Sequence, residues 1–482
     1  MESESFEYFA ADASKASRAI CEAKDGDIRD EYQIDRDRIL YSKAFRRLRG
    51  KTQVFIAGFD DHVRNRLSHT FEVSQIARTI AHKLGLNEML TEAIALGHDL
   101  GHTPFGHVGE RVLHEISCRE KVLKEKDFCS EQKDRGFKHN WQSVRVANDL
   151  EFHNRDYPGL NLTKETLWGF LHHSSLKYSE KKYPSNLCEL YFYENMYNSF
   201  FQDEKDWSFE AYIVSVADEI AQRHHDVEDG LITCILDKAG LIKKLEEYFD
   251  VIENPEKESL MSMLEKAKGE LYTDFYLETL AKAVVNLYVQ LTVKNMANFL
   301  SEINTKMEID ADSQKFNECK AQIWETFLKG KDKEVLESML SKTLYEADKR
   351  LQDEYLKKRI LLSYQAQKSD GKAAYIIKKI VESFLSNPQQ MPDTAILNTF
   401  IEYEKRNDTS PKEAVDKILN VSGKAEVVGT KRIEMDELME KNECSFKAAL
   451  VRAIVDYVAG MTDDYAIALY EQLYGGNKQN RY

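Results

Sequence analysis

Residues 66–110 read RLSHTFEVSQIARTIAHKLGLNEMLTEAIALGHDLGHTPFGHVGE, and this stretch decides the fold class of the chain. Apolar residues recur close to the helical period over residues 70–84 and again over residues 87–100. The spacing therefore predicts two amphipathic helices, the second of which ends at an adjacent histidine and aspartate. Glycines and a proline then interrupt residues 101–109, which predicts a loop or a short helical turn.

The same stretch concentrates side chains that bind metals and move protons. They are His69, His98, Asp99, His102, His107 and Glu110. Neutral imidazole and carboxylate together suit a divalent metal, with Mg or Mn favoured and Fe, Co, Ni or Zn as alternatives. A metal held in this way can orient a water molecule and lower its pKa for attack on a phosphoryl centre. All 13 histidines of the chain lie between residues 62 and 225, so we expect the chemistry in the first half.

The composition predicts a large helical protein. The chain has 482 residues, enough for one large domain or two, and only 7 prolines and 21 glycines. No run of 18 or more apolar residues is present, so we expect no membrane span. The acidic N-terminus does not resemble a signal peptide. Seven scattered cysteines without a CxxC motif predict reduced thiols and a cytoplasmic location.

The charge distribution favours a phosphorylated small molecule over a nucleic-acid backbone. The net charge of −15 opposes electrostatic binding of nucleic acid in bulk. Residues 38–59 nevertheless contain six basic side chains and no acidic one, and two further arginines follow at positions 64 and 66. A polyphosphate needs such a local positive patch even in an acidic protein, although a solvated helix face explains any single basic residue equally well.

Several motif blocks follow one another in an order that resembles a known family. The blocks are RDEYQIDRDRILYSKAFRRLRGKTQVF (29–55), HDLGHTPFGHVGE (98–110), GFKHNWQSVRV (136–146), YPGLNLTKETL (157–167), IVSVADEIAQRHHDVEDG (213–230) and DYVAGMTDDYAIALYEQLYG (456–475). Together they are similar to the HD-domain deoxyguanosine triphosphate triphosphohydrolases (dGTPases, or dNTPases). The resemblance covers about residues 28–230 and returns near 450–475.

This resemblance implies an all-α fold with an HD-domain helical core and a helical C-terminal extension packed on it. We expect an N-terminal segment over residues 1–27, a catalytic core over 28–234 and a C-terminal region over 235–482 that also contributes to oligomerisation. Residues 117–137 are charged and predict an exposed insert.

The resemblance also implies roles for individual residues. The four metal ligands fall on His69, His98, Asp99 and Asp218. The proton-transfer pair falls on His107 and Glu110, with His102 as a further contact to phosphate. Substrate contacts fall on Gln53, Arg64, Arg66, His139, Asn140 and Asp226. Gln53 and Asp226 match positions that hold the sugar 3′-hydroxyl, and Arg66, with help from Arg64, matches a phosphate-contacting arginine.

Spacing adds one independent argument for the proton-transfer pair. His107 and Glu110 lie three residues apart, so in a helix they share a face and the carboxylate can orient the imidazole. One position departs from the family: Gln222 stands where the family often has tyrosine, which leaves the preference among bases open. The remaining histidines are interpreted as structural, although the positions of His172, His173 and His224 beside the motifs leave open that they lie near the site.

The expected function is metal-dependent hydrolysis of dGTP, and of other dNTPs, to deoxynucleoside and inorganic triphosphate. The alternatives are another HD-domain nucleotide phosphohydrolase and a non-catalytic regulator that binds nucleotides or single-stranded DNA. The resemblance further implies a homo-oligomer, with a hexamer favoured, and leaves open an activating nucleotide or single-stranded DNA as a second ligand. No membrane partner is expected.

Overall fold

The fold is built from helices. The computed structural model describes residues 5–22, 26–53, 64–118, 136–151, 157–174, 201, 205–253, 255–329, 332–407, 409–419, 424–441 and 443–475. Over these residues it contains no β-strand, and the only ladder contacts are two isolated bridges, Arg18–Thr163 and Thr52–Asn65. The predicted all-α fold class is confirmed. Most of the charged insert expected over 117–137 lies outside the described residues.

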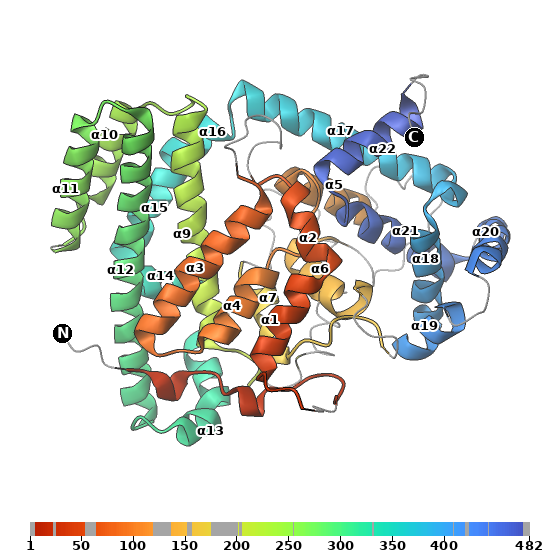
Figure 1. The fold of residues 1–482 in the computed structure, drawn as a ribbon, viewed down its shortest axis with the longest axis horizontal. Helices are drawn as coiled ribbons and strands as arrows, with labels where there is room; N and C mark the ends of the chain where they lie inside the picture. Colours follow the sequence, from red (N-terminus) through yellow and green to blue (C-terminus); the bar gives the residue numbers. More distant parts are fainter. Residues whose placement is uncertain are drawn as a thin grey trace.

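The helices of the first half occupy the middle of the molecule (Figure 1). They are α1 (Glu31–Tyr41), α2 (Lys43–Arg47), α3 (Arg66–Leu84), α4 (Glu88–Gly97), α5 (Gly106–Ser117), α6 (His139–Arg145), α7 (Lys164–His172) and α9 (Phe209–Ile232). Helices α3 and α9 pack against each other, and both contact α4. This arrangement brings segments that are 150 residues apart in sequence to one place.

The helices of the second half flank this centre on both sides (Figure 1). On one side lie α10 (Lys238–Phe249), α11 (Glu256–Gly269), α12 (Thr273–Met307), α13 (Ser313–Ile323), α14 (Asp332–Leu340), α15 (Lys342–Arg350) and α16 (Lys357–Ile360). Helix α17 (Tyr364–Ser386) leads across to the other side, where α18 (Asp393–Arg406), α19 (Pro411–Leu419), α20 (Lys424–Glu440), α21 (Cys444–Ala459) and α22 (Asp463–Tyr474) lie.

Two hydrophobic cores hold these groups together. The larger core joins α1–α4, α6, α7 and α9 to the helices between residues 236 and 360. The smaller core joins α17–α22 to α5 and contains no side chain from the other first-half helices. Helix α5 therefore belongs to the core of the C-terminal helices, although its sequence continues directly from the histidine–aspartate turn.

Local sequence signals explain where most helices begin. Asp30 and Gln33 form a reciprocal capping box at the start of α1. Asn65 caps α3, and Thr163 caps α7. The apolar residues of the segment 28–50 indicate a single helix, and this interpretation is wrong. The side chain of Ser42 accepts a hydrogen bond from the backbone N–H of Phe45 and starts a second helix there.

The segment after the histidine–aspartate turn is more helical than the sequence predicts. Instead of a loop or short turn, α5 begins at Gly106 and continues for 12 residues. Gly109 lies inside the helix and does not break it. It allows close packing there, since an added Cβ would lie 2.1 Å from the backbone oxygen of Pro104. The helix is reached through Phe105, which adopts a left-handed conformation with φ of 61°.

The cysteines differ from expectation at two positions. Cys21, Cys234 and Cys319 are free thiols, as predicted. Cys118 and Cys444 are disulfide-bonded, so the prediction of reduced thiols throughout is wrong there. Sequence spacing alone could not reveal these bonds, because pairing depends on which cysteines the fold brings together.

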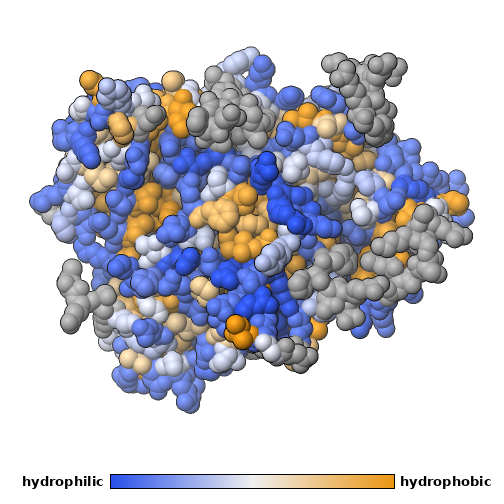
Figure 2. Space-filling model, viewed as in Figure 1, coloured by the Kyte–Doolittle hydropathy of each residue, from blue (hydrophilic) through white to orange (hydrophobic). Residues whose placement is uncertain are grey.

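Hydrophilic residues cover most of the face shown in Figure 2, with hydrophobic residues gathered over α2 and α3. Phe45 and Phe71 make an edge-to-face contact there, and Phe71 is 52% exposed. Among the described residues, no helix combines the length and the apolar character that crossing a membrane requires.

A buried carboxyl group at the start of α7 leads to a prediction about stability. Burial raises the pKa of Glu165 from 4.5 to about 7. The folded protein therefore retains a proton that the unfolded chain releases, and the cost in stability grows as the pH rises from 4.5 to 7. We expect Glu165→Gln to stabilise the fold by about 1–2 kcal/mol more at pH 8 than at pH 5. The free energy of unfolding in urea, measured at both pH values, tests this. Glu346→Gln, at an exposed position, is the control. An equal gain in stability at the two pH values would contradict the prediction.

Candidate active site

The histidine–aspartate turn is held rigidly between α4 and α6. His98 is the C-cap of α4, and Asp99 follows it directly. The hydroxyl of Ser143 in α6 donates to the backbone oxygen of His98 at 2.7 Å and accepts from the backbone N–H of Gly101 at 2.9 Å. Gly101 is required at this approach, since an added Cβ would lie 2.1 Å from the backbone nitrogen of Ser143. The backbone of the turn is thereby fixed before any ligand arrives.

The four predicted metal ligands come together from three elements. His69 of α3 places Nε2 2.9 Å from Oδ1 of Asp218 in α9. The Nε2 atom of His98 lies 3.4 Å from Oδ1 of Asp99 and 3.8 Å from Oδ1 of Asp218. His69, His98 and Asp99 also offer ligand atoms that lie within 4.8 Å of one another. The polar atoms of the four side chains therefore face a common position.

The nitrogen and oxygen atoms around this position suit a divalent cation. The Nδ1 atom of His98 lies 2.7 Å from the backbone oxygen of Ala95, so Nδ1 carries the proton and Nε2 presents a lone pair. That buried Nε2 has no hydrogen-bond partner. A lone pair and two carboxylates facing one another repel unless a cation lies between them.

The two carboxylates are ionised despite their burial. Burial would raise the pKa of Asp99, but His102, His98 and Arg66 hold it well below its usual range. Burial acts in the same direction on Asp218, and the hydrogen bond from His69 outweighs it, so its pKa is also lowered. Anionic ligands are thus available at neutral pH.

A second group of histidines lies beside these ligands. The Nδ1 atom of His139 in α6 makes a short hydrogen bond to Oε2 of Glu110 in α5, and its Nε2 lies 3.2 Å from Nε2 of His173. His173 bonds through Nδ1 to the backbone oxygen of Phe170 at 2.6 Å, so its Nε2 is an acceptor. Each ring nitrogen of His139 therefore lies within hydrogen-bonding distance of a polar group, Glu110 on one side and His173 on the other.

Glu110 carries a negative charge beside His139. Burial would raise the pKa of its carboxyl, but His139 lies against it and, with Lys138 and His107, holds the pKa well below the usual range. The expected pairing of Glu110 with His107 is therefore not the contact that the structure shows: the hydrogen bond goes to His139 instead. The i, i+3 spacing is present in α5, but the partner of the carboxylate comes from another helix.

His102 connects the two groups. Its Nε2 lies 3.0 Å from Oδ1 of Asp99, and its ring stacks on His139 with centroids 3.9 Å apart. Burial lowers its pKa well below the usual value, helped by Arg66. A neutral imidazole thus links the carboxylate of the metal set to His139.

His107 reaches solvent on the same side. Its ring lies 5.8 Å from that of His102 and 6.5 Å from that of His139. The side chain is exposed, yet protein atoms surround it densely enough that desolvation lowers its pKa to about 4, against the opposing charge of Glu110. In the ligand-free protein this imidazole is neutral at pH 7.

Two of the predicted substrate contacts retain unused hydrogen-bonding groups. Arg66 bonds through Nη1 to Oδ2 of Asp99 at 2.7 Å, but its buried Nε–H has no partner. The buried Oε1 of Gln53 likewise has no partner. Both residues lie against Gly106, because a Cβ added there would be 3.4 Å from Nη2 of Arg66 and 3.6 Å from the backbone oxygen of Gln53.

Asp226 lies eight residues beyond Asp218 on α9. Its Oδ2 accepts a hydrogen bond from the side-chain amide of Gln352 at 3.3 Å. Burial raises the pKa of Asp226 to about 6, with Arg223 opposing. The carboxyl group therefore changes charge close to neutral pH.

Two further predicted contacts bond elsewhere in this structure. Arg64 forms ion pairs with Glu72 at 2.7 Å, with Asp229 at 3.4 Å and with Glu228. The side-chain amide of Asn140 donates to the backbone oxygen of Leu171 at 2.9 Å and so holds the end of α7, next to His173.

Glu72, His224 and His225 form another cluster of metal-binding types, in which both carboxylate oxygens of Glu72 already have partners. Oε2 of Glu72 lies 2.8 Å from Nδ1 of His224 and 2.8 Å from Nε2 of His225. Its Oε1 accepts from Nε of Arg64 at 2.7 Å. This cluster is therefore an ion-pair network beside the metal set.

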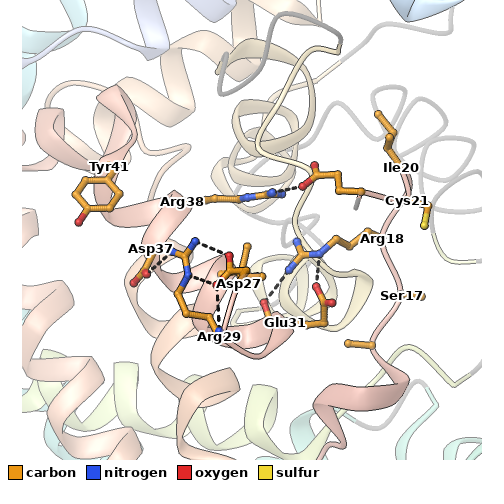
Figure 3. A pocket seen from close by; sticks show the side chains of 13 residues that line it. Ser17, Arg18, Ile20, Cys21, Asp27, Arg29, Glu31, Asp37, Arg38 and Tyr41 are labelled. Atoms are coloured by element: carbon orange, nitrogen blue, oxygen red, sulfur yellow. Dashed lines mark hydrogen bonds and ion pairs between the residues drawn. The ribbon is translucent and has the colours of Figure 1, made fainter. Parts of the chain in front are cut away.

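A separate pocket of about 370 Å³ lies between α1 and the N-terminal segment (Figure 3). None of the residues above lines it. Its three guanidinium groups, from Arg18, Arg29 and Arg38, are turned toward carboxylates (Figure 3). Those carboxylates belong to Glu22, Asp27, Glu31 and Asp37. Because four acids face three arginines, the pocket has no unpaired positive charge for an anionic ligand.

Comparison with known proteins agrees with this geometry. A model of the HD domain matches residues 66–223, which contain His69, His98, Asp99 and Asp218, and a model of the phosphohydrolase-associated domain matches residues 427–472. A protein of Leptospira interrogans named deoxyguanosinetriphosphate triphosphohydrolase-like protein is 31% identical over 472 residues, which cover 97% of this chain and 95% of that protein.

The chain belongs to the deoxyguanosinetriphosphate triphosphohydrolase-like family. Proteins of the same name from Clostridium perfringens and Wolinella succinogenes are also similar to it. The first is 31% identical over 448 residues, covering 93% of this chain and 88% of that protein. The second is 44% identical over 244 residues, covering 51% of this chain and 57% of that protein. The resemblance inferred from the motif blocks is confirmed.

The sequence assigns His173 no role, although it leaves open that this residue lies near the site. In the structure its ring lies 4.9 Å from that of His98 and its Nε2 contacts His139. Its place in the sequence, at the end of α7, gives no periodic or motif signal, and only the packing of α7 on α4 and α6 brings it to the site.

Proposed function

We propose that this protein hydrolyses deoxynucleoside triphosphates, dGTP foremost, to the deoxynucleoside and inorganic triphosphate. One observation carries the proposal most directly: the ligand set around His98 lies within a few ångströms of histidines and an arginine that retain unused polar atoms. The printed names of the relatives support the choice of substrate. A divalent metal held by His69, His98, Asp99 and Asp218 would lower the pKa of a water and polarise a phosphoryl oxygen.

The residues of this chain then have distinct tasks. The unused Nε–H of Arg66 and the imidazole of His139 bind phosphate oxygens, with His102 as a further contact. Oε1 of Gln53 and the carboxyl of Asp226 hold the sugar 3′-hydroxyl. Arrival of the triphosphate raises the pKa of His107, because nearby negative charge favours the imidazolium.

The reaction balances with one water per nucleotide. The water oxygen bonds to the α-phosphorus, and the bond from that phosphorus to the 5′-oxygen breaks. His107 donates a proton to the departing 5′-oxygen. Of the two water protons, one returns to His107 and the other is lost to solvent.

The assay that tests this proposal follows products from dGTP, GTP and 2′,3′-dideoxy-GTP with Mg²⁺ or Mn²⁺. We expect deoxyguanosine and triphosphate from dGTP, and much slower turnover of GTP. The dideoxy analogue should lose about 10–100-fold in kcat/KM, because Gln53 and Asp226 would remain unpaired.

Other outcomes identify the competing functions. Release of dGMP and pyrophosphate would indicate another type of HD-domain nucleotide phosphohydrolase. Nucleotide binding without turnover would indicate a regulatory protein. Assembly into a homo-oligomer, with a hexamer favoured, and activation by a nucleotide or by single-stranded DNA stay predictions of the family resemblance.

A further inference from the structure

One carboxylate from the C-terminal helices connects two separate parts of the candidate active site. Asp463 is the first residue of α22, and it is 1% exposed. Its Oδ2 accepts hydrogen bonds from the backbone N–H of Thr52 at 3.0 Å and from the Thr52 hydroxyl. Its Oδ1 accepts from the backbone N–H of Phe105 at 2.8 Å. Thr52 and Phe105 are 53 residues apart in sequence and more than 350 residues from Asp463.

The two segments carry different halves of the proposed chemistry. Thr52 immediately precedes Gln53, whose free Oε1 is assigned to the sugar. Phe105 immediately precedes α5, which carries His107 and Glu110. The position of Asp463 therefore sets the spacing between the residue that binds the sugar and the helix that moves the proton.

The Phe105 contact holds an unfavourable backbone conformation. Phe105 has φ of 61° and ψ of 26°, in the left-handed region that is unfavourable for a residue other than glycine. Its ring is buried in the smaller core, so the conformation is fixed from both the side chain and the backbone. Without the hydrogen bond to Asp463, this N–H would be buried and unpaired at the point where α5 begins.

Lys51 forms a second connection between the same parts. It is 1% exposed, and its ammonium group donates to the backbone oxygen of His102 and, at 2.9 Å, to that of Ala459 at the end of α21. The charges of Lys51 and Asp463 favour each other across this junction. The loop from Asp99 to Phe105 is thus connected to the C-terminal helices at two points, at His102 through Lys51 and at Phe105 through Asp463.

A simple capping role does not account for Asp463. The side chain of Thr462 already caps α22 by accepting from the backbone N–H of Tyr465. The neighbouring Asp464 is exposed and supplies a negative charge to the same first turn. The carboxylate of Asp463 is used instead on Thr52 and Phe105.

We propose that Asp463 is a positioning residue through which the C-terminal helices set the competence of the active site. The proposal rests on the proposed function for the roles of Gln53 and His107. It extends that function by assigning a task to the region that matches the phosphohydrolase-associated domain: this region orders the sugar-binding segment and the start of α5 together.

The test compares Asp463→Asn with Asp464→Asn, which removes the same charge from the same helix turn. The asparagine keeps the shape of Asp463 but puts a donor nitrogen in place of one oxygen and removes the charge, so one of the two connections breaks and the other is weakened. We expect at least a tenfold loss of kcat, with bound metal unchanged. The penalty for dideoxy-GTP relative to dGTP should also shrink, because Gln53 is no longer held. Asp464→Asn should behave as wild type in both respects.

Amide hydrogen exchange supplies a measurement that needs no substrate. In Asp463→Asn, peptides covering residues 48–53 and 103–112 should exchange faster than in wild type, while peptides from α3 should not. Thr52→Val is a milder second variant, since it removes only the hydroxyl bond and should shift the same peptides to a smaller extent.

Two results would overturn the proposal. The first is that Asp463→Asn equals Asp464→Asn both in turnover and in the exchange rates of the two peptides. The other is faster exchange with wild-type turnover and an unchanged dideoxy penalty, which would make Asp463 structural only. If wild-type protein hydrolyses no dNTP, the proposed function fails, and the exchange comparison still decides whether Asp463 orders the two segments.

Discussion

Asp99→Asn is expected to abolish turnover of dNTPs, with a loss on the order of 10³-fold or more, equivalent to about 4 kcal/mol of transition-state stabilisation. The carboxylate of Asp99 lies 3.4 Å from the lone pair of His98, 2.7 Å from Arg66 and 3.0 Å from His102. The neutral amide removes the anionic metal ligand while keeping its volume. It also leaves Arg66 without its ionic partner, so bound metal should fall together with activity.

The measurement is metal content per chain after dialysis against Mn²⁺, followed by single-turnover rates. His82→Gln is the matched control, because His82 is exposed on α3 and pairs only with Glu88 in the same part of the fold. The helical content by circular dichroism should stay at the wild-type level in both variants. Retention of wild-type metal content by Asp99→Asn would remove this residue from the ligand set.

His107→Ala is expected to lower kcat by about 10²–10⁴-fold while leaving metal binding intact, which is the usual range for a positioned acid–base group. The imidazole is the histidine of this group that reaches solvent, and Glu110 is the charge that favours its protonated form. Because the proton goes to the leaving oxygen, substrates with a more acidic leaving group should lose less.

Glu110→Gln provides the second arm of this experiment. It removes the partner of the His139 imidazole and the charge that acts on His107. Since both effects serve one proton transfer, the double variant should lose less than the product of the single losses. Fully multiplicative losses, or release of metal by His107→Ala, would contradict a shared role.

The predictions from sequence were most accurate where a periodic pattern or a motif fixed local structure. The apolar period located α3 and α4. The predictions were less accurate where tertiary contacts override local preference. The glycines of α5 looked like helix breakers, but Gly106 begins the helix with a positive φ and Gly109 packs closely against residues 103–104.

The pairing of side chains was decided by the tertiary structure. Spacing within α5 suggested that Glu110 orients His107, whereas the structure gives Glu110 to His139. His173 reaches the same group although nothing in its sequence surroundings marks it. Such contacts join different helices, so they depend on how the helices pack and on which rotamers that packing allows.

The sequence by itself determined the helical class, the family and the residues that supply metal-binding chemistry, because each of these follows from local period or from residue types in a fixed order. The tertiary structure alone placed α5 in the core of the C-terminal helices and brought Asp463 against Thr52 and Phe105. A hydrogen bond across more than 350 residues has no local signature. It exists only because burial forces the backbone donors of two distant segments to share one acceptor.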